Sequence, residues 1–374
     1  MTATPAAATT PDGHFAALGR LHRLAIARCG TATHDLVIGP WRIRLVFAGA
    51  GLAETLLGPL KRLGAPVAGT ADATIEVWDS AGSETATPDL PPVAASASPG
   101  PGSAEPGLAP PPAHPDPNRP SSGIALPRHR SVYAREGDQS DSLAMFDSRE
   151  RIGRFWFRDG AQIRWYERAE PLRTALHWAL TGPDAYLAHA SAVGDERGAV
   201  VLTGRGGTGK TTTTLAALDA GLRFVGDNYV LVSVREPVPR VYGLFGTAKL
   251  WPATLEQLPQ LAPLVLTHKV ARDEKLVADI AAHRPETLAT GLPVRAVVVP
   301  EVVGTGPARM TPCSPVQALL AMAPATMLQL PRTDRGFAGM AELVRRVPTY
   351  RLQLGAELRD GPRALSDLLA EVGS

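Results

Sequence analysis

The chain has 374 residues, of which 44% are hydrophobic and 20% are charged, values that are ordinary for a globular protein. Its formal net charge of +2, without a basic block, argues against a nucleic-acid-binding protein. The two cysteines give neither a disulfide framework nor a spaced metal set, and no stretch is long and apolar enough to span a bilayer, so we expect a cytoplasmic protein without a membrane partner.

Residues 1–79 are expected to form a small α+β unit. Within "HDLVIGPWRIRLVF", alternation at Ile43, Leu45 and Phe47 predicts strands of a half-buried sheet. The segment "GLAETLLGPLKRLG" has helical spacing and ends at Gly64, and "ATIEVW" predicts one more strand. The residue pattern of this unit predicts a fold but does not indicate catalytic or binding residues.

Residues 80–130 differ in composition from both flanks, because Pro, Ala, Gly and Ser dominate them. Such a segment has too little apolar surface to offset the entropy of ordering, which predicts a disordered or polyproline-like linker. A ligand for a proline-binding domain is the alternative. The linker would separate the first unit from a second domain over residues 131–374.

The second domain begins with "RIGRFWFRDGAQIRWYE", which we interpret as a hairpin turning at Asp159 and Gly160. An amphipathic helix opened by Pro171 follows. Beyond it, apolar runs alternate with helical stretches, which is typical of an α/β core.

A glycine-rich loop lies in the middle of this domain and fits the pattern G-x-x-x-x-G-K-[ST]. Its residues are Gly204, Arg205, Gly206, Gly207, Thr208, Gly209, Lys210 and Thr211. An apolar strand over 199–202 precedes the loop, and a helix over 212–220 is expected after it. In this context backbone N–H groups and the helix N-terminus favour a phosphate. We therefore expect ATP to contact the loop and Thr212, with Lys210 on the β- and γ-phosphates and Thr211 on Mg²⁺.

A carboxylate follows the next strand. Phe224 and Val225 lead into Gly226, Asp227 and Asn228, which places Asp227 at a strand end near the loop. An acid there can hold Mg²⁺ or accept a proton from an attacking hydroxyl. The alternative is an aspartate that only makes a turn.

Two further residues are candidates for the site, and each of them also has an ordinary structural interpretation. His189, in "HASAVG", precedes the loop strand, where a lone histidine is otherwise a core residue. Lys249, in "FGTAKL", could stabilise charge on a transferred phosphoryl group or could be an exposed lysine at a strand end. Lys269 and Lys275, in "HKVARDEKLV", are interpreted as the solvated face of a helix.

Together, "HASAVG", "GRGGTGKTTTTLAAL", "GLRFVGDN" and, more loosely, "VYGLFGTAKL" resemble the HPr kinase/phosphorylase group, P-loop proteins related in their nucleotide site to phosphoenolpyruvate carboxykinase. His189 lies 15 positions before Gly204, and Asp227 lies 17 positions after Lys210, as in that family. The resemblance covers residues 168–251, under a quarter of the chain. It implies a P-loop core of HPr kinase type.

The resemblance also implies roles. In the family, paired acids follow the loop and one of them takes the proton from a serine hydroxyl. By position, Asp227 is the candidate base or metal ligand, His189 would support the metal or the acid, and Lys249 would stabilise the transferred phosphoryl group. Asn228 replaces the second acid; its amide oxygen can bind Mg²⁺, but it brings no charge and no base. The family motif for phosphorolysis is not recognisable, so we expect no efficient phosphorylase activity.

The leading hypothesis is an ATP- and Mg²⁺-dependent kinase that transfers the γ-phosphoryl group to a hydroxyl. The acceptor would be a serine of a peptide or protein, or a small metabolite. A nucleotide-responsive regulatory protein without phosphotransfer is the alternative that Asn228 favours. A simple ATPase or GTPase is disfavoured by the short interval between Lys210 and Asp227, and a homo-oligomer, as in the related enzymes, stays open.

Overall fold

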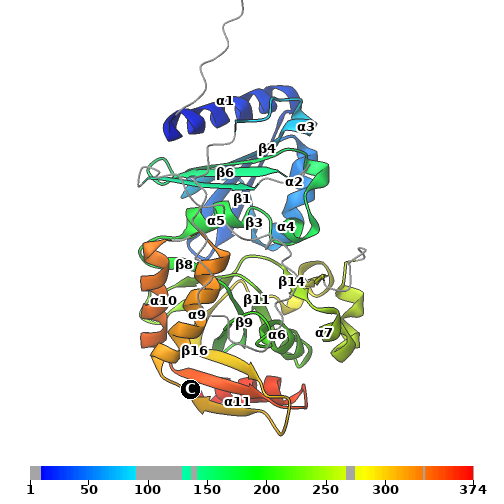
Figure 1. Ribbon diagram of the computed structural model, residues 1–374, viewed down its shortest axis with the longest axis vertical. Coiled ribbons are helices and arrows are strands. Elements are labelled where there is room, and N and C mark those ends of the chain that lie inside the picture. Colours follow the sequence, from blue (N-terminus) through cyan, green and yellow to red (C-terminus); the bar gives the residue numbers. More distant parts are fainter. Residues whose placement is uncertain (1–9, 90–128, 136–140, 267–273, 332, 374) are drawn as a thin grey trace, which may run out of the picture.

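The structure, a computed structural model, describes residues 10–89, 129–135, 141–266, 274–331 and 333–373. These residues form a mixed α/β fold in which two large sheets lie one above the other (Figure 1). Residues 90–128, the greater part of the segment for which we predicted a disordered linker, lie outside the described residues. Among the described helices, none combines the length and apolar character that crossing a membrane requires.

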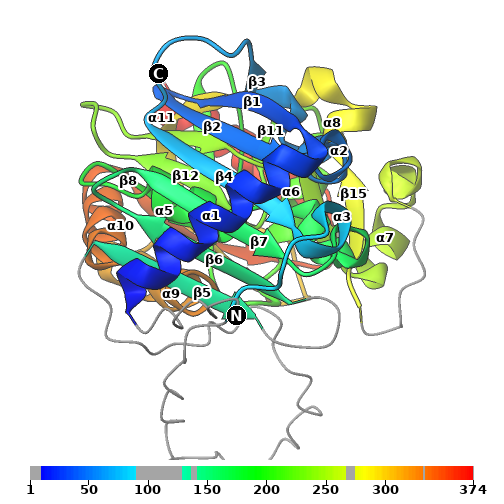
Figure 2. The ribbon, with the colours of Figure 1, turned by 90° about the horizontal axis from the view of Figure 1, so that it is seen from above.

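The first sheet has seven strands in the order β3-β1-β2-β4-β7-β6-β5. Its strands are β1 Thr31–Ile38, β2 Trp41–Ala48, β3 Gly64–Ala65, β4 Ala73–Asp79, β5 Arg130–Arg135, β6 Ser142–Asp147 and β7 Ile152–Phe157. Its helices are α1 Pro11–Cys29, α2 Ala50–Leu57, the 3₁₀ helix η1 Gly58–Leu63 and α3 Ser80–Ser83. Figure 2 shows α1 lying across the strands on the outer face of this sheet.

Period-two alternation separates the two faces of the first sheet. Ile43 and Leu45, as predicted, are fully buried on the inner face, in the core that also holds residues of α5 (Arg173–Leu180). Trp78 and Trp156, at paired positions of β4 and β7, face α1 and pack with its Phe15. Both faces of the sheet are therefore apolar and covered at β4 and β7, so the prediction of a half-buried sheet is wrong.

The first sheet extends beyond residue 131, where we predicted the second domain to begin. β4 pairs in parallel with β7, and β7 continues the sheet through β6 to β5. Strands from both sides of the predicted linker thus belong to one sheet. The composition change marks a connection within the first unit, because strand pairing is not limited to neighbours in sequence.

The predicted hairpin at Asp159 and Gly160 is wrong. The turn of the hairpin falls earlier, between Asp147 and Ile152, which pair across β6 and β7. Asp159 instead accepts a hydrogen bond from the Ala161 N–H (2.8 Å) and begins the 3₁₀ helix η3, Gly160–Gln162. An aspartate before a glycine occurs both in hairpin turns and at the start of a helix, so the dipeptide does not distinguish the two. The choice between them depends on which strand β7 pairs with.

The second sheet has nine strands, seven of them in the order β11-β9-β10-β16-β13-β12-β8, with β18 beside β16 and β17 beside β18. The strands are β8 Ala185–Ala188, β9 Ala190–Asp195, β10 Gly198–Thr203, β11 Arg223–Gly226, β12 Val230–Ser233, β13 Arg240–Gly243, β16 Gly291–Val302, β17 Arg309–Pro312 and β18 Thr349–Leu354. A separate pair is formed by β14 Thr247–Leu250 and β15 Leu276–Asp279. The remaining helices are α4 Trp165–Ala169, α5 Arg173–Leu180, α6 Lys210–Asp219, α7 Pro252–Gln257, η4 Pro259–Leu264, α8 Ile280–His283, η5 Pro285–Thr287, α9 Pro315–Gln329, α10 Asp334–Arg346 and α11 Asp360–Val372.

Helices cover both faces of the second sheet. Along β10, Val200 and Leu202 pack on the side of α6 and α11. Ala199 and Val201 pack on the opposite side, against α9 and α10 (Figure 1). A strand that is buried on both faces has apolar residues at successive positions, which explains the continuous apolar run before the loop.

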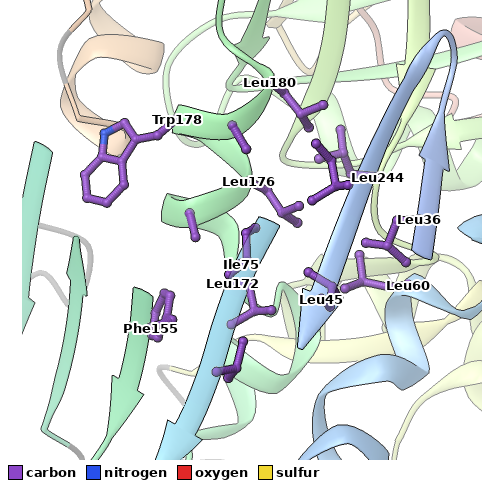
Figure 3. Packing of buried hydrophobic residues seen from close by; sticks show 14 of the residues in the cluster. Leu36, Leu45, Leu60, Ile75, Phe155, Leu172, Leu176, Trp178, Leu180 and Leu244 are labelled. Atoms are coloured by element: carbon purple, nitrogen blue, oxygen red, sulfur yellow. The ribbon is translucent and has the colours of Figure 1, made fainter. Parts of the chain in front are cut away.

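The two sheets share a core where they meet. Figure 3 shows Leu45 and Leu60 of the first unit beside Leu176 of α5 and Leu244 of the second. The buried guanidinium of Arg62 donates to the Val225 carbonyl (2.8 Å). This contact lies two residues before Asp227, so the first unit helps to position the sheet edge described below.

His177 of α5 makes the fold sensitive to acid. Its ring is buried and contacts the Pro331 carbonyl at 2.9 Å. Burial lowers the pKa of His177 to about 4, opposed by that hydrogen bond. Because the unfolded chain takes up this proton first, we expect the stability to be full above pH 6.5 and to fall as the pH falls toward 4, by about 2 kcal/mol at pH 5.

We expect His177→Gln to remove this dependence. Denaturant unfolding at pH 7 and at pH 5 measures it: between the two, the stability of wild type should fall by about 2 kcal/mol more than that of the variant. Equal losses would show that His177 does not remain neutral in the fold.

Candidate functional site

One edge of the second sheet gathers the candidate residues. β9 is antiparallel to both β10 and β11, so β10 and β11 run in the same direction and end at the same edge. The glycine-rich loop follows β10, Asp227 follows β11, and β9 begins next to His189 at this edge. The predicted strand before the loop is present, and the predicted helix is α6, which begins two residues earlier than expected, at Lys210.

The loop has a backbone that needs its glycines. Gly204 and Gly209 have φ values of 145° and 93°, a region that favours glycine. A Cβ on Gly209 would also lie 2.7 Å from Cδ1 of Leu354. No side chain caps α6, so the first amides of this helix are free to bind an anion.

Lys210 folds back into the loop. Its Nζ donates to the carbonyls of Gly204 (2.6 Å) and Arg205 (2.9 Å). Burial lowers the pKa of Lys210 to about 8, although Asp227 opposes this and Lys275 adds to it. The ammonium thus lies inside the loop, in contact with groups that a phosphate could replace.

Asp227 is the hub of hydrogen bonds at the edge. The Thr211 hydroxyl lies 3.1 Å from both carboxylate oxygens of Asp227, and the Ser191 hydroxyl donates to Oδ1 at 2.6 Å. The Lys249 backbone N–H approaches Oδ2 at 3.4 Å. Thr212 is directed elsewhere, since its hydroxyl contacts that of Thr254 at 2.9 Å.

A second buried carboxylate, Glu170, lies on the other side of Lys249. It connects α4 to α5 and accepts from Lys249 Nζ (2.6 Å), from the Asn228 amide nitrogen (2.6 Å) and from Arg173 (3.3 Å). Lys249 is 7% exposed, so it is not the exposed strand-end lysine of the alternative interpretation. Burial lowers the pKa of Lys249, and Glu170 opposes that shift.

The Asn228 side chain is hydrogen-bonded to Glu170 and is not one of the groups that surround Asp227. It adopts a left-handed backbone (φ 67°), which asparagine tolerates. Its amide nitrogen is directed to Glu170, as described above. The side chain that replaces the second acid of the resembling family is therefore hydrogen-bonded to an acid from another part of the chain.

His189 is buried at the edge and, within the described part of the chain, no hydrogen bond joins it to Asp227. Its backbone N–H donates to Thr326 Oγ1 (3.0 Å), and its ring lies edge-on to Tyr229 with centroids 5.3 Å apart. Nδ1 is buried and has no hydrogen-bond partner among the residues that the structure describes. Burial, followed by the charges of Lys210 and other cations, holds the pKa of His189 well below its usual range, so the ring is neutral.

Positive charge accumulates around this edge. The cations that act on His189 are Lys210, Lys275, Lys249 and Arg173. Lys275 directly precedes β15, with Nζ 5.5 Å from the Trp251 ring centroid, and is not on the helical face that we expected; Lys269 lies outside the described residues. This concentration of charge beside free helix amides favours an anion.

The oxygens of Thr211 and Asp227 suit a hard cation. They lie at the loop and already face each other at 3.1 Å. Among the described residues, no group of three or more His, Cys, Asp or Glu side chains could hold a metal ion. A hydroxyl and a carboxylate side by side suit Mg²⁺, which keeps waters and binds through one or two protein groups and phosphates.

Three residues of this site were not predicted from the sequence. Ser191 lies in the quoted "HASAVG", and its place two positions after His189 on the same strand edge was the available signal. Glu170 and Arg173 lie in "ERAEPLRTALHWAL", which shows only a helical pattern.

Glu170→Gln should destabilise the fold by about 3 kcal/mol, because it leaves the Lys249 ammonium buried without its carboxylate. Denaturant unfolding at pH 7 measures the loss. Glu342→Gln is the matched control, since Glu342 pairs with Arg345 on the surface of α10 and should lose far less. Similar losses in both variants would contradict the assignment of Glu170 as the partner of Lys249.

The comparisons with known proteins add little to this geometry. No protein-family model matches the chain, and no curated protein matches it. Among solved structures, the chain is similar to the HPr(Ser) kinase/phosphatase from Coxiella burnetii, with a TM-score of 0.27 and 12% identity over 50% of this chain and 94% of that one. A likeness at this level carries no argument about fold or function.

Proposed function

We propose that the chain is an ATP-dependent kinase that transfers the γ-phosphoryl group to a hydroxyl of a peptide, protein or small metabolite. The observation that carries the proposal is the meeting of Thr211 and Asp227 at the N-terminus of α6, beside Lys210. A phosphate loop alone supports nucleotide binding. A buried carboxylate hydrogen-bonded to its threonine adds a group for transfer chemistry.

Each residue of the site has a role in the proposed phosphoryl transfer. The loop amides and Lys210 bind the phosphates, and Lys249 stabilises the transferred group. The acceptor oxygen forms a bond to the γ-phosphorus while the bond from that phosphorus to the bridging oxygen of ADP breaks. The hydroxyl proton passes to the Asp227 carboxylate. Ser191 orients that carboxylate, and the buried ring of His189 is neutral and exchanges no proton.

Thr211 and Asp227 would hold Mg²⁺, and the Asn228 amide oxygen is the candidate for a further ligand, since the amide nitrogen and not the oxygen is the atom that contacts Glu170. When bound, the ion supplies charge neutralisation on the phosphate oxygens. Asp227 thus has two roles, as proton acceptor and as metal ligand, which the Mg²⁺ titration described in the Discussion separates.

Product analysis tests the proposal. Purified protein with Mg²⁺ and ATP is assayed for ADP, with and without an extract of small proteins, peptides and metabolites. A kinase forms ADP only when an acceptor is present. ADP formed equally without an acceptor would mean a hydrolase and would contradict the proposal.

One observation favours a second candidate, a nucleotide-responsive regulatory protein. Asn228 brings no charge to the site, and its amide is engaged with Glu170. In that case ATP would bind tightly but no ADP would form under either condition. The same product analysis, with a binding measurement beside it, separates the two candidates.

A further inference from the structure

Trp251 has an exposed aromatic ring at the start of α7, which lies beside α6 (Figure 1). It directly follows β14, the strand that carries Lys249. Its neighbour Leu250 is fully buried in the core that also holds Leu215 of α6, whereas the Trp251 side chain is 46% exposed. A single exposed apolar residue needs no explanation, so the meaning of this ring depends on the groups near it.

The first turn of α7 contacts the first turn of α6. The Thr254 N–H donates to the Trp251 carbonyl (2.9 Å), and the Thr254 hydroxyl contacts that of Thr212 (2.9 Å). Thr211, one position earlier on α6, is directed to Asp227 instead. Successive residues of a helix point about 100° apart, so α7 borders the loop on a different side from Asp227. Because the transferred phosphate is assigned to the side of Asp227, the nucleoside can extend toward α7.

The Lys275 ammonium is near both the Trp251 ring and the loop. Its Nζ lies 5.5 Å from the centroid of the ring, within the range of a cation–π contact. Burial lowers the pKa of Lys210, and the charge of Lys275 adds to that shift, so the two ammonium groups are within electrostatic reach of each other. A cation near both an aromatic ring and the phosphate loop suits a ligand with a base at one end and phosphates at the other.

Resting on the nucleotide binding of the proposed function, we propose that Trp251 binds the base of a purine nucleoside triphosphate by stacking its indole ring on it. The triphosphate occupies the glycine-rich loop, and Lys275 contributes its charge to the phosphates. Every base has an aromatic face, so stacking on one ring distinguishes adenine little from guanine. Trp251 therefore holds the nucleoside without selecting ATP over GTP.

The test compares ligands with and without a base. Inorganic tripolyphosphate has the phosphates of ATP but no base. Its affinity and the affinities of ATP and GTP are measured by calorimetric titration with Mg²⁺ for the full chain, for Trp251→Ala and for Trp251→Phe. Phe337→Ala is the matched control, because Phe337 is 47% exposed and lies on α10, which covers the other face of the second sheet.

We expect Trp251→Ala to lower the affinities for ATP and GTP by about 10- to 100-fold, the effect of removing a ring on which a base stacks. Its affinity for tripolyphosphate should be that of wild type, which also shows that the loop is correctly folded. Trp251→Phe should keep most of the affinity for both nucleotides, since phenylalanine also stacks. Phe337→Ala should bind all three ligands as wild type does.

Each other outcome overturns the assignment of Trp251. If Trp251→Ala binds ATP as tightly as wild type does, the base lies elsewhere and the kinase proposal stands. If it loses affinity for tripolyphosphate to the same extent, or if Phe337→Ala shows the same loss, the contribution is not specific to the base. If Trp251→Phe is as weak as Trp251→Ala, stacking is not the cause. If wild type binds neither ATP nor tripolyphosphate, the proposed function fails and the base site with it.

Discussion

Replacing Lys210 with alanine should abolish nucleotide-dependent activity and weaken ATP binding by more than about 100-fold. The ammonium lies inside the glycine-rich loop and bonds to the Gly204 and Arg205 carbonyls, so it is already among the groups that would contact a triphosphate. A charge-assisted contact to phosphate, made where Lys210 is only 8% exposed, is among the stronger polar contacts that a protein makes. Isothermal titration with ATP and Mg²⁺ measures the loss.

Two further variants interpret this result. Lys210→Met keeps the length of the side chain but removes its charge, so it should lose as much affinity as alanine if charge is what matters. Lys61→Ala removes an exposed lysine of the first unit and should leave affinity unchanged. ATP binding of wild-type strength in Lys210→Ala would mean that the loop is not the triphosphate site.

Asp227→Asn should lower turnover by about 10² to 10⁴ while leaving ATP binding largely intact. The amide has the shape of the carboxylate, and its oxygen can still accept from Thr211 and Ser191, so the local structure should persist. What is lost is the charge that accepts a proton or holds a cation. Initial rates with a saturating acceptor extract, with ATP affinity measured beside them, test this expectation.

Varying the Mg²⁺ concentration separates the two roles of Asp227. If Asp227 is chiefly a metal ligand, high Mg²⁺ should restore part of the turnover of Asp227→Asn; if it is chiefly the proton acceptor, the loss should stay constant. Asp279→Asn is the control, because Asp279 caps α8 through Oδ1 and asparagine caps equally well. Full turnover in Asp227→Asn would remove Asp227 from both roles.

The local parts of this account could be predicted from sequence. The apolar run of β10, the glycines and the helical spacing of α6 are neighbours in the chain, so their pattern predicted strand, loop and helix. Asp227 could be placed at a strand end for the same reason. The contact of Asp227 with Thr211 depends on the position of β9 between β10 and β11. The order of strands in a sheet cannot be predicted from the local pattern of residues.

The non-local parts could not be predicted. Glu170 reaches Lys249 from 79 residues away in sequence, and nothing in "ERAEPLRTALHWAL" distinguishes it from a solvated helix residue. The pairing of β4 with β7 likewise crosses the segment that looked like a domain boundary. Both contacts are decided by how the two sheets pack on a shared core, a property of the whole chain.

The most direct test of the central claim is incubation of the purified protein with γ-labelled ATP, Mg²⁺ and a cognate cell extract, beside the Asp227→Asn variant. We expect a labelled hydroxyl compound that forms with wild type and is nearly absent with the variant. Release of the label only as inorganic phosphate, or tight ATP binding with no labelled product, would contradict it.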